Sequence, residues 1–160
     1  MDMKIRYAGE NDLGPMIDLT LEAFKPIFES FQKILDPEIY AVLHPHWQRT
    51  QQKIVEDALA DEYITLWVAE MDQKVVGLIT LVLDKENKIG ELHFLAVHPA
   101  YQNRGVGSAL NAFVLDKMRE AGMEVAMVST GGDPSHAPAR KVYEKAGYIP
   151  LPIVNYYQKL

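Results

Sequence analysis

The spacing of hydrophobic and polar positions changes along the chain, and these changes predict which segments are helices and which are strands. In the first third, Ile17, Leu21, Phe24 and Phe28 recur at the spacing of one helix face. Pro26 is expected to break or kink that helix, because proline lacks the N–H that a helix interior needs. Further helix boundaries are expected at two proline-containing pairs, Asp36-Pro37 and His44-Pro45. The first third is therefore predicted to be helical with interruptions.

Strand patterns flank and follow this helical region. A short alternating segment at 4–8 predicts an edge strand. Runs of β-branched and aliphatic residues at 63–70, 75–83 and 89–97 are separated by short polar segments. These three runs predict sequential antiparallel strands.

The last third of the chain contains both helical spacing and strand-like apolar runs. Helical spacing at 105–121, followed by an apolar run at 125–130, predicts a crossover helix and a strand parallel to the one before it. A short helix at 138–146 and a closing strand at 153–159 complete the pattern. We therefore expect a single α/β domain over residues 1–160, with a central mixed, mostly antiparallel twisted sheet flanked by helices.

Composition then narrows the classes of function. The 160 residues include 22 acidic side chains, 16 Lys and Arg side chains and no Cys, for a net charge of -6. The lack of Cys excludes a disulfide scaffold, a thiolate zinc site and a Cys nucleophile, and no metal is expected. Net acidity argues against binding nucleic acid, whose phosphates are neutralised by Lys and Arg. A charged N-terminal segment and the lack of an apolar run near the ~20 residues of a membrane span predict a cytoplasmic protein without membrane partners.

The segment between the strand at 89–97 and the helix at 105–121 is the most informative. Gly105 and Gly107 lack Cβ atoms, so an anion can approach the unpaired N–H groups of the helix start. One alternative is an ordinary strand-to-helix turn. A dinucleotide site is a poor match, because Leu110 stands where its third Gly or Ala belongs and too little chain follows for a second βα half.

Two blocks resemble the GNAT superfamily of N-acetyltransferases. The run Gln102-Asn103-Arg104-Gly105-Val106-Gly107, after Leu95-Ala96-Val97-His98-Pro99, resembles its acyl-coenzyme A signature. A second block, Ala139-Arg140-Lys141-Val142-Tyr143-Glu144-Lys145-Ala146-Gly147-Tyr148, resembles its later helix, in which a Tyr precedes a Gly-aromatic pair by four residues. The resemblance implies a GNAT-like fold and acetyl-CoA as co-substrate. It further implies direct acetyl transfer to a primary amine, of a small molecule or of a protein N-terminus or lysine, in a ternary complex.

The resemblance also implies where the co-substrate binds. Its diphosphate would lie on the backbone of the glycine turn, formed by Gln102, Asn103, Arg104, Gly105, Val106, Gly107 and Ser108. The pantetheine arm would run beside Leu95, Ala96 and Val97, with a bulge at Leu95 opening the sheet. His136 stands where many members have an Asn that contacts the arm, and it could bind cofactor, assist proton transfer or cap the helix.

Three side chains are candidates for the chemistry. Strand alternation predicts that Glu91, His93 and Leu95 share one face, and the resemblance implies Glu91 as base with His93 as second choice. Tyr143 is the candidate acid, because a phenol with a pKa of about 10 is protonated at neutral pH and can donate to a thiolate. The alternatives are a solvated Glu91, a hydrogen-bonded His93 and a Tyr143 that only packs in the core.

The sequence says least about the amine that would accept the acetyl group. In this family the first helices cover the acceptor pocket, which makes several side chains of the first third candidate wall residues: Phe24, Phe28, Glu29, Phe31, Tyr40, His46 and Trp47. Aromatic residues at helical spacing more often serve packing. The net negative charge of the chain favours a cationic amine as the acceptor. The alternative function is a non-catalytic acyl-CoA-binding sensor or interaction module, and the closing strand could pair across a homodimer.

Overall fold

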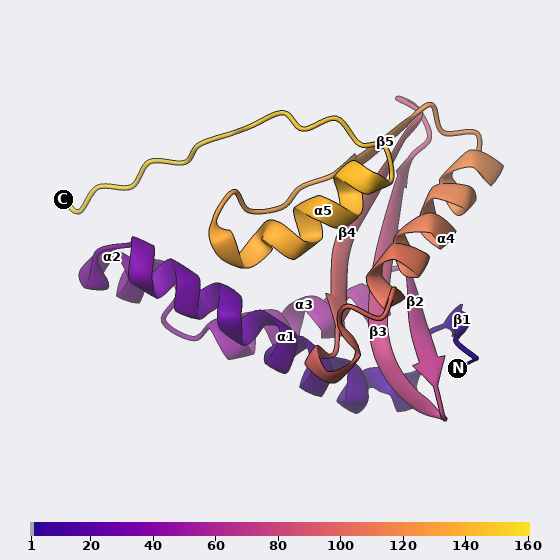
Figure 1. Cartoon of the computed structure of the whole chain (residues 1–160), viewed down its shortest axis with the longest axis horizontal. Coiled ribbons are helices and arrows are strands. Elements are labelled where there is room, and N and C mark those ends of the chain that lie inside the picture. Colours follow the sequence, from indigo (N-terminus) through magenta and orange to yellow (C-terminus); the bar gives the residue numbers. More distant parts are fainter. Residues whose placement is uncertain (1) are drawn as a thin grey trace.

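The predicted apolar runs pair into one sheet in the order in which they occur in the chain. The computed structural model describes residues 2–160, and its sheet has the order β1-β2-β3-β4-β5 (Figure 1). The strands are β1 (Lys4–Tyr7), β2 (Ile64–Met71), β3 (Lys74–Asp84), β4 (Ile89–Val97) and β5 (Val125–Val128). The first three pairings are antiparallel, and β4 pairs with β5 in parallel. This confirms the mixed, mostly antiparallel α/β fold.

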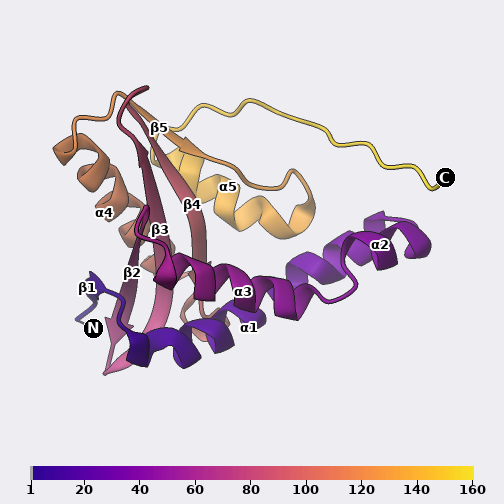
Figure 2. The same cartoon turned by 180° about the vertical axis from the view of Figure 1, so that it is seen from behind.

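The helices cover the two faces of this sheet. Helices α1 (Leu13–Ile34), α2 (Pro37–Leu43) and α3 (Trp47–Ala60) form one group, and α4 (Val106–Glu120) and α5 (Ala137–Lys145) form the other. Figures 1 and 2 show α1 and α3 on the face opposite α4 and α5. Three short 3-10 turns, η1 (Glu10–Asp12), η2 (Pro99–Tyr101) and η3 (Pro134–His136), precede α1, α4 and α5. The expected order of helices and strands up to residue 146 is therefore confirmed.

Each face of the sheet has its own hydrophobic cluster. On the α4 side, Ile79 and Leu92 from the sheet pack with Leu110 of α4. On the α1 and α3 side, Met16 and Val55 pack against Val68 of β2 and its neighbours. The sheet is thus buried on both faces, which fixes the direction in which each β4 side chain points.

The expected break at Pro26 is wrong, because α1 is one continuous helix from Leu13 to Ile34. Pro26 is exposed and lacks the N–H that would bond to the helix four residues earlier. Buried residues on both sides of it, Leu19 and Phe28 among them, attach both halves of the helix to the fold. Tertiary packing therefore outweighs the local cost of the proline.

The expected closing strand at 153–159 is also wrong, because no helix or strand follows Lys145 in the described part of the chain. The segment leaves the end of α5 and runs back past α5 toward α2 without joining the sheet (Figures 1 and 2). Pro150 and Pro152, just before the segment, lack the N–H groups that would extend a strand back toward α5. Its side chains stay exposed, and Lys159 forms an ion pair with Glu38 of α2.

Candidate active site

A β-bulge in β4 is the feature that shapes the site. Thr80 of β3 pairs with Phe94, and the next residue, Leu81, pairs with Leu92, so His93 has no partner in β3. An extra residue in one strand bends that strand and reverses its alternation. The bulge therefore lies at His93 and not at Leu95, where we expected it.

The bulge also overturns the expected shared face of Glu91, His93 and Leu95. Leu92 and Leu95 both pack with the α4 cluster, whereas Phe94 packs with the α1 cluster. Glu91, next to Leu92 in the regularly paired part of β4, lies on the opposite face from Leu92 and therefore from Leu95. The bulged His93 side chain is exposed. Simple alternation fails here because it assumes an uninterrupted strand.

The parallel pairing of β4 with β5 ends at the same point. Residues Ile89 to Leu92 pair with Val125 to Val128, and within residues 2–160 the ladder goes no further. The last residues of β4 consequently lack a strand on their β5 side. This parting of the two strands leaves main-chain groups of Leu95 and Val97 facing the gap, where an extended ligand could pair with them, whereas Ala96 pairs with Leu78 of β3.

The glycine turn sits at the end of this opening. Gly105 is the N-cap of α4 with a φ of 83°, a left-handed conformation that favours glycine, and no side chain caps the helix. A Cβ on Gly107 would lie 3.7 Å from Val97, so the backbone is close to the end of β4. The uncapped amides at the start of a 15-residue helix can receive an anion.

Two side chains of the turn have local partners. Gln102 donates from Nε2 to the Val97 carbonyl at 3.0 Å, so it braces the turn against β4. The Arg104 guanidinium lies 5.4 Å from the centre of the Tyr101 ring. Arg104 also borders a pocket of about 490 Å³ together with Met71 and Val106.

Tyr143 lies on the opposite side of the parted strands from Glu91. It belongs to the hydrophobic cluster on the α4 side, is 8% exposed, and meets Tyr148 edge to face with the ring centres 5.7 Å apart. Burial, with a smaller contribution from Tyr148, raises the pKa of Tyr143 to about 12. Glu91 and Tyr143 therefore lie on opposite faces of the sheet.

A cluster around Asp133 was not predicted from the sequence. The Asp133 carboxylate is 9% exposed and accepts hydrogen bonds from Ser30 Oγ at 2.7 Å, from the Ser135 backbone N–H and hydroxyl, and from His136 Nδ1. Arg140 braces the same loop by donating to the Gly131 and Asp133 carbonyls. The three-residue spacing of Asp133 and His136 was a usable signal, but Ser30 lies 103 positions away and had none.

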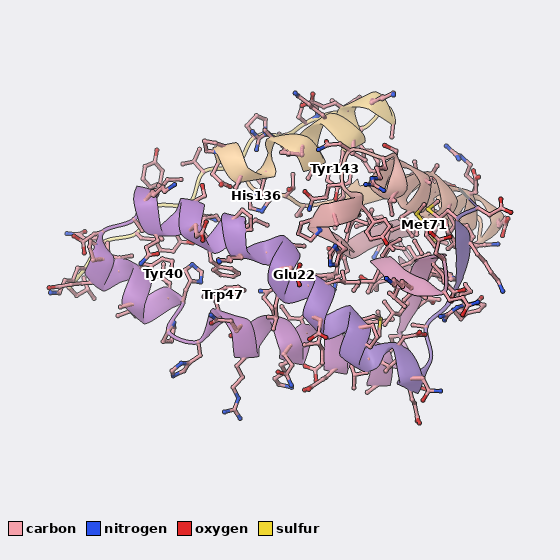
Figure 3. The ribbon with its side chains drawn as sticks, turned by 60° about the horizontal axis from the view of Figure 1, so that its bottom comes forward. Glu22, Tyr40, Trp47, Met71, His136 and Tyr143 are labelled. Atoms are coloured by element: carbon pink, nitrogen blue, oxygen red, sulfur yellow. The ribbon has the colours of Figure 1, made fainter. Side chains whose placement is uncertain are left out.

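The candidate acceptor residues divide into two groups. Phe28, Glu29, Tyr40 and Trp47 line one pocket of about 450 Å³ between α1 and the α2–α3 segment. Figure 3 shows Tyr40 and Trp47 on one side of α1 and His136 and Tyr143 on the other. The remaining three candidates do not line this pocket: Phe24 stacks on Phe94, Phe31 lies between the rings of His44 and His136, and His46 is exposed before α3.

Within residues 2–160, no helix is both long and apolar enough to cross a membrane. The same residues contain no group of three or more His, Asp or Glu side chains arranged to hold a metal ion.

The start of α4 is open to an anion, and it lies next to the point where β4 and β5 part. These two features together are typical of α/β proteins that bind an extended anionic ligand between two strands. Residues 27–148 match the acetyltransferase (GNAT) family. The match covers more than half of the chain, and the protein therefore belongs to this family.

Individual relatives agree with this assignment. The chain is 31% identical over 113 residues to a mycothiol acetyltransferase of Sanguibacter keddieii, covering 66% of this chain and 35% of that protein. It is 25% identical over 154 residues to an S-(2-succino)cysteine N-acetyltransferase of Bacillus subtilis, covering 93% of this chain and 86% of that protein. The chain thus spans about a third of the first relative and most of the second.

The fold agrees as well. The crystal structure of an aminoglycoside N-acetyltransferase in complex with CoA superimposes with a TM-score of 0.68 at 19% identity. The superposition covers 99% of this chain and 95% of that one.

Proposed function

We propose that the protein is an acetyl-CoA-dependent N-acetyltransferase that transfers the acetyl group to a primary amine by direct attack in a ternary complex. The observation that carries the proposal is the opening between β4 and β5 next to the uncapped start of α4, with Glu91 and Tyr143 on opposite faces of the sheet. Direct transfer needs a route that brings thioester and amine together from two sides, and this opening supplies one.

The co-substrate would be held mainly by backbone groups. Its diphosphate would lie on the amides from Gln102 to Ser108, where the helix start favours negative charge. Its pantetheine arm would run beside Leu95, Ala96 and Val97 beyond the end of the β4–β5 ladder and would pair with the main-chain groups that face the gap. The thioester supplies an activated acetyl group, so the protein needs no covalent intermediate of its own.

Glu91 and Tyr143 would then divide the proton chemistry. Glu91 takes the proton of the attacking amine, with the exposed His93 as the second candidate. A backbone N–H near Leu95 can hold the developing oxyanion. Because the pKa of Tyr143 is about 12, full transfer of its proton to a thiolate whose pKa is about 8.5 is uphill. Tyr143 would therefore stabilise the departing sulfur as a hydrogen-bond donor.

The acceptor would be a small-molecule amine carrying positive charge. The names of the relatives specify acetylation of mycothiol and of S-(2-succino)cysteine, and the structural relative is an aminoglycoside enzyme. In this chain, the pocket beside α1 combines Glu22 and Glu29 with the rings of Phe28, Tyr40 and Trp47. Carboxylates together with aromatic faces favour a cationic amine.

The alternative is a non-catalytic acyl-CoA-binding sensor or interaction module, which would need the glycine turn but not Glu91 and Tyr143 together. We also propose a cytoplasmic location, because an enzyme of this type needs a supply of acetyl-CoA. A homodimer formed through the exposed C-terminal segment is the third part of the proposal.

The decisive experiment follows release of free CoA thiol from acetyl-CoA by the purified protein. The amine panel consists of S-(2-succino)cysteine, an aminoglycoside, spermidine and a peptide with a free N-terminus, and calorimetry with CoA and with NAD runs in parallel. We expect CoA but not NAD to bind, and at least one amine to accelerate thiol release. CoA binding without turnover on any amine would favour the sensor, and an absence of CoA binding would overturn both functions.

A further inference from the structure

His98 joins the end of β4 to helix α1, and the proposed reaction does not yet use it. It follows Val97, the last residue of β4, and the segment between β4 and α4 reaches α1 (Figure 1). The backbone N–H of His98 donates to the Val76 carbonyl at 2.9 Å, and the His98 carbonyl accepts from the Tyr101 N–H at 2.8 Å. The main chain of His98 is therefore bonded to β3 on one side and to η2 on the other.

The His98 imidazole has a separate partner for each nitrogen. Nδ1 accepts from the backbone N–H of Ala100 at 3.1 Å and so caps η2. A nitrogen that accepts from an N–H carries no hydrogen itself, so the hydrogen of the ring lies on Nε2. Nε2 lies 3.4 Å from Oε2 of Glu22 on α1, and a carboxylate oxygen accepts hydrogen bonds. The ring thus connects η2 to α1.

The contacts continue from His98 to the turn that would hold the diphosphate. The His98 ring meets Tyr101 edge to face with the ring centres 5.7 Å apart, and the Arg104 guanidinium lies 5.4 Å from the centre of the Tyr101 ring. Arg104 directly precedes Gly105, the N-cap of α4. A change in the position of the His98 ring is therefore passed through Tyr101 to the side chain beside the uncapped amides.

Glu22 also lines the pocket of the proposed acceptor. Its side chain is 59% exposed, so water competes for its contact with His98. A carboxylate has two oxygens, which can accept from two different donors. A cationic group in the pocket can therefore bind one oxygen while the other remains on His98. Such an occupant orders the Glu22 side chain and reduces the entropy cost of the His98 contact.

We propose that Glu22 binds a cationic group of the acceptor, and that His98 is a positioning residue through which this contact steadies the turn that holds the diphosphate. The inference rests on the proposed acetyltransferase function and identifies a link between its two substrate sites. Coupling between two ligands is reciprocal, so the amine and CoA tighten each other by the same factor. An exposed contact of this kind accounts for a factor of about 2 to 5.

The test measures CoA binding by calorimetry with and without a saturating amine. CoA carries no acetyl group, so no transfer occurs and both ligands can be bound at equilibrium. The amine is the member of the panel above that binds the protein most tightly. We expect it to lower the Kd for CoA about 2- to 5-fold in the wild-type protein. A Kd for CoA that the amine leaves unchanged or raises would overturn the link.

Two variants break the link from opposite sides. Glu22→Ala removes the carboxylate, whereas His98→Asn removes the contact with Glu22 but keeps an oxygen that can accept from Ala100. In both variants the Kd for CoA should be the same with and without amine. His98→Asn is the sharper test, because it leaves the side chains of the pocket intact.

Glu29→Ala is the matched control for Glu22→Ala. Glu29 is another exposed carboxylate of the same pocket, but it lies seven residues, or about 10.5 Å, further along α1. Glu29→Ala should weaken the amine and still show a Kd for CoA that is about 2- to 5-fold lower when the amine is saturating. Loss of this difference in Glu29→Ala would assign the coupling to the charge of the pocket and overturn the role of His98.

The double variant separates a shared link from two independent effects. With the amine saturating, Glu22→Ala combined with His98→Asn should bind CoA within about twofold of His98→Asn alone. Losses that simply add would show that the two residues act on the turn separately, and would overturn the pair. If amine and CoA tighten each other but no amine is acetylated, the failure lies in the proposed function. If amines are acetylated without such coupling, the proposed function stands and the link is overturned.

Discussion

Burial gives Tyr143 a hydroxyl that remains protonated across the range in which enzymes are usually assayed. Its pKa is raised to about 12, so the neutral form predominates in the folded protein well above pH 10. We predict that Tyr143→Phe lowers kcat roughly 10²–10⁴-fold while the Kd for CoA changes little. The loss should be the same from about pH 7 to pH 10, because Tyr143 does not ionise within that interval.

The matched control is Tyr148→Phe, which alters the ring that packs edge to face on Tyr143. The Tyr148 hydroxyl points to Asn111 Oδ1 at 3.4 Å, so its loss should leave kcat within about twofold. Steady-state thiol release at several pH values measures both variants. Unchanged turnover in Tyr143→Phe would remove this residue from the mechanism.

Two adjacent glycines offer a separate test of the loop that holds His136. A Cβ at Gly131 would collide with His136 Nδ1 and approach Asp133 Oδ1 at 2.6 Å, whereas a Cβ at Gly132 would have no other atom within 4 Å. We predict that Gly131→Ala lowers the free energy of unfolding by about 1–3 kcal/mol, because the added Cβ displaces the His136 ring, and that Gly132→Ala does not. Equal midpoints of urea unfolding for the two variants would contradict the close packing of this loop.

At the scale of single elements, the sequence predicted where β4 lies but not its shape. Runs of apolar residues are a local signal, and they located the strand correctly at residues 89–97. The bulge at His93 depends on how β4 meets β3, a contact between segments about 14 residues apart, and no local pattern reports it. The shared face expected for Glu91 and Leu95 failed for this reason. The Ser30–Asp133 contact was out of reach for the same reason, since its partners are separated by 103 positions.

At Pro26, packing of α1 against the rest of the protein outweighs a local helix-breaking signal, and this leads to a prediction about stability. The residue is exposed in the middle of α1 and makes no backbone donation there. We predict that Pro26→Ala raises the free energy of unfolding by about 1–2 kcal/mol, because Ala suits a helix interior about 3 kcal/mol better and the freer unfolded chain offsets part of the gain.

Lys25→Ala is the control, since it changes an exposed neighbour in the same turn without altering backbone hydrogen bonding. Urea unfolding followed by circular dichroism measures both variants, and the urea concentration at the midpoint should rise for Pro26→Ala alone. A Pro26→Ala protein no more stable than the wild type would mean that α1 is bent to suit the proline in a way that Ala cannot exploit.

At the scale of the whole molecule, the order of elements was predictable up to α5 because each element carries its own periodicity. The segment after α5 was not, because a strand exists only with a partner strand. Its large apolar side chains are exposed, and they are Ile149, Leu151, Ile153, Val154, Tyr156, Tyr157 and Leu160. On the sheet itself, β5 is the last strand in the order, and its Val125 and Met127 are 55% and 43% exposed. One chain thus displays an exposed apolar segment outside the sheet and a sheet edge without a neighbouring strand.

These two features are complementary, so we predict that residues 153–159 of one copy add to the β5 edge of a second copy. Exposed strand edges pair readily, and burial of apolar side chains favours the association. Pro150 and Pro152 stiffen the connection to α5 and hold the segment away from the β5 of its own chain. Light scattering coupled to size exclusion should therefore report a dimer, and Ile153→Asp should shift it toward monomer.

Because the chain has no Cys, a designed disulfide can identify which β5 the segment meets. In a Met127→Cys, Val154→Cys double variant, oxidation should yield a covalent dimer on a non-reducing gel. Mixing the two single variants should yield the same dimer, whereas each single variant alone should yield little of it. Cross-linking confined to one chain would show that the segment folds back on its own sheet, and a monomer at all concentrations would contradict the pairing altogether. In the dimer, the partner's segment would lie on the side of β5 that faces away from β4. The opening between β4 and β5 would stay free, so the disulfide-linked protein should retain turnover.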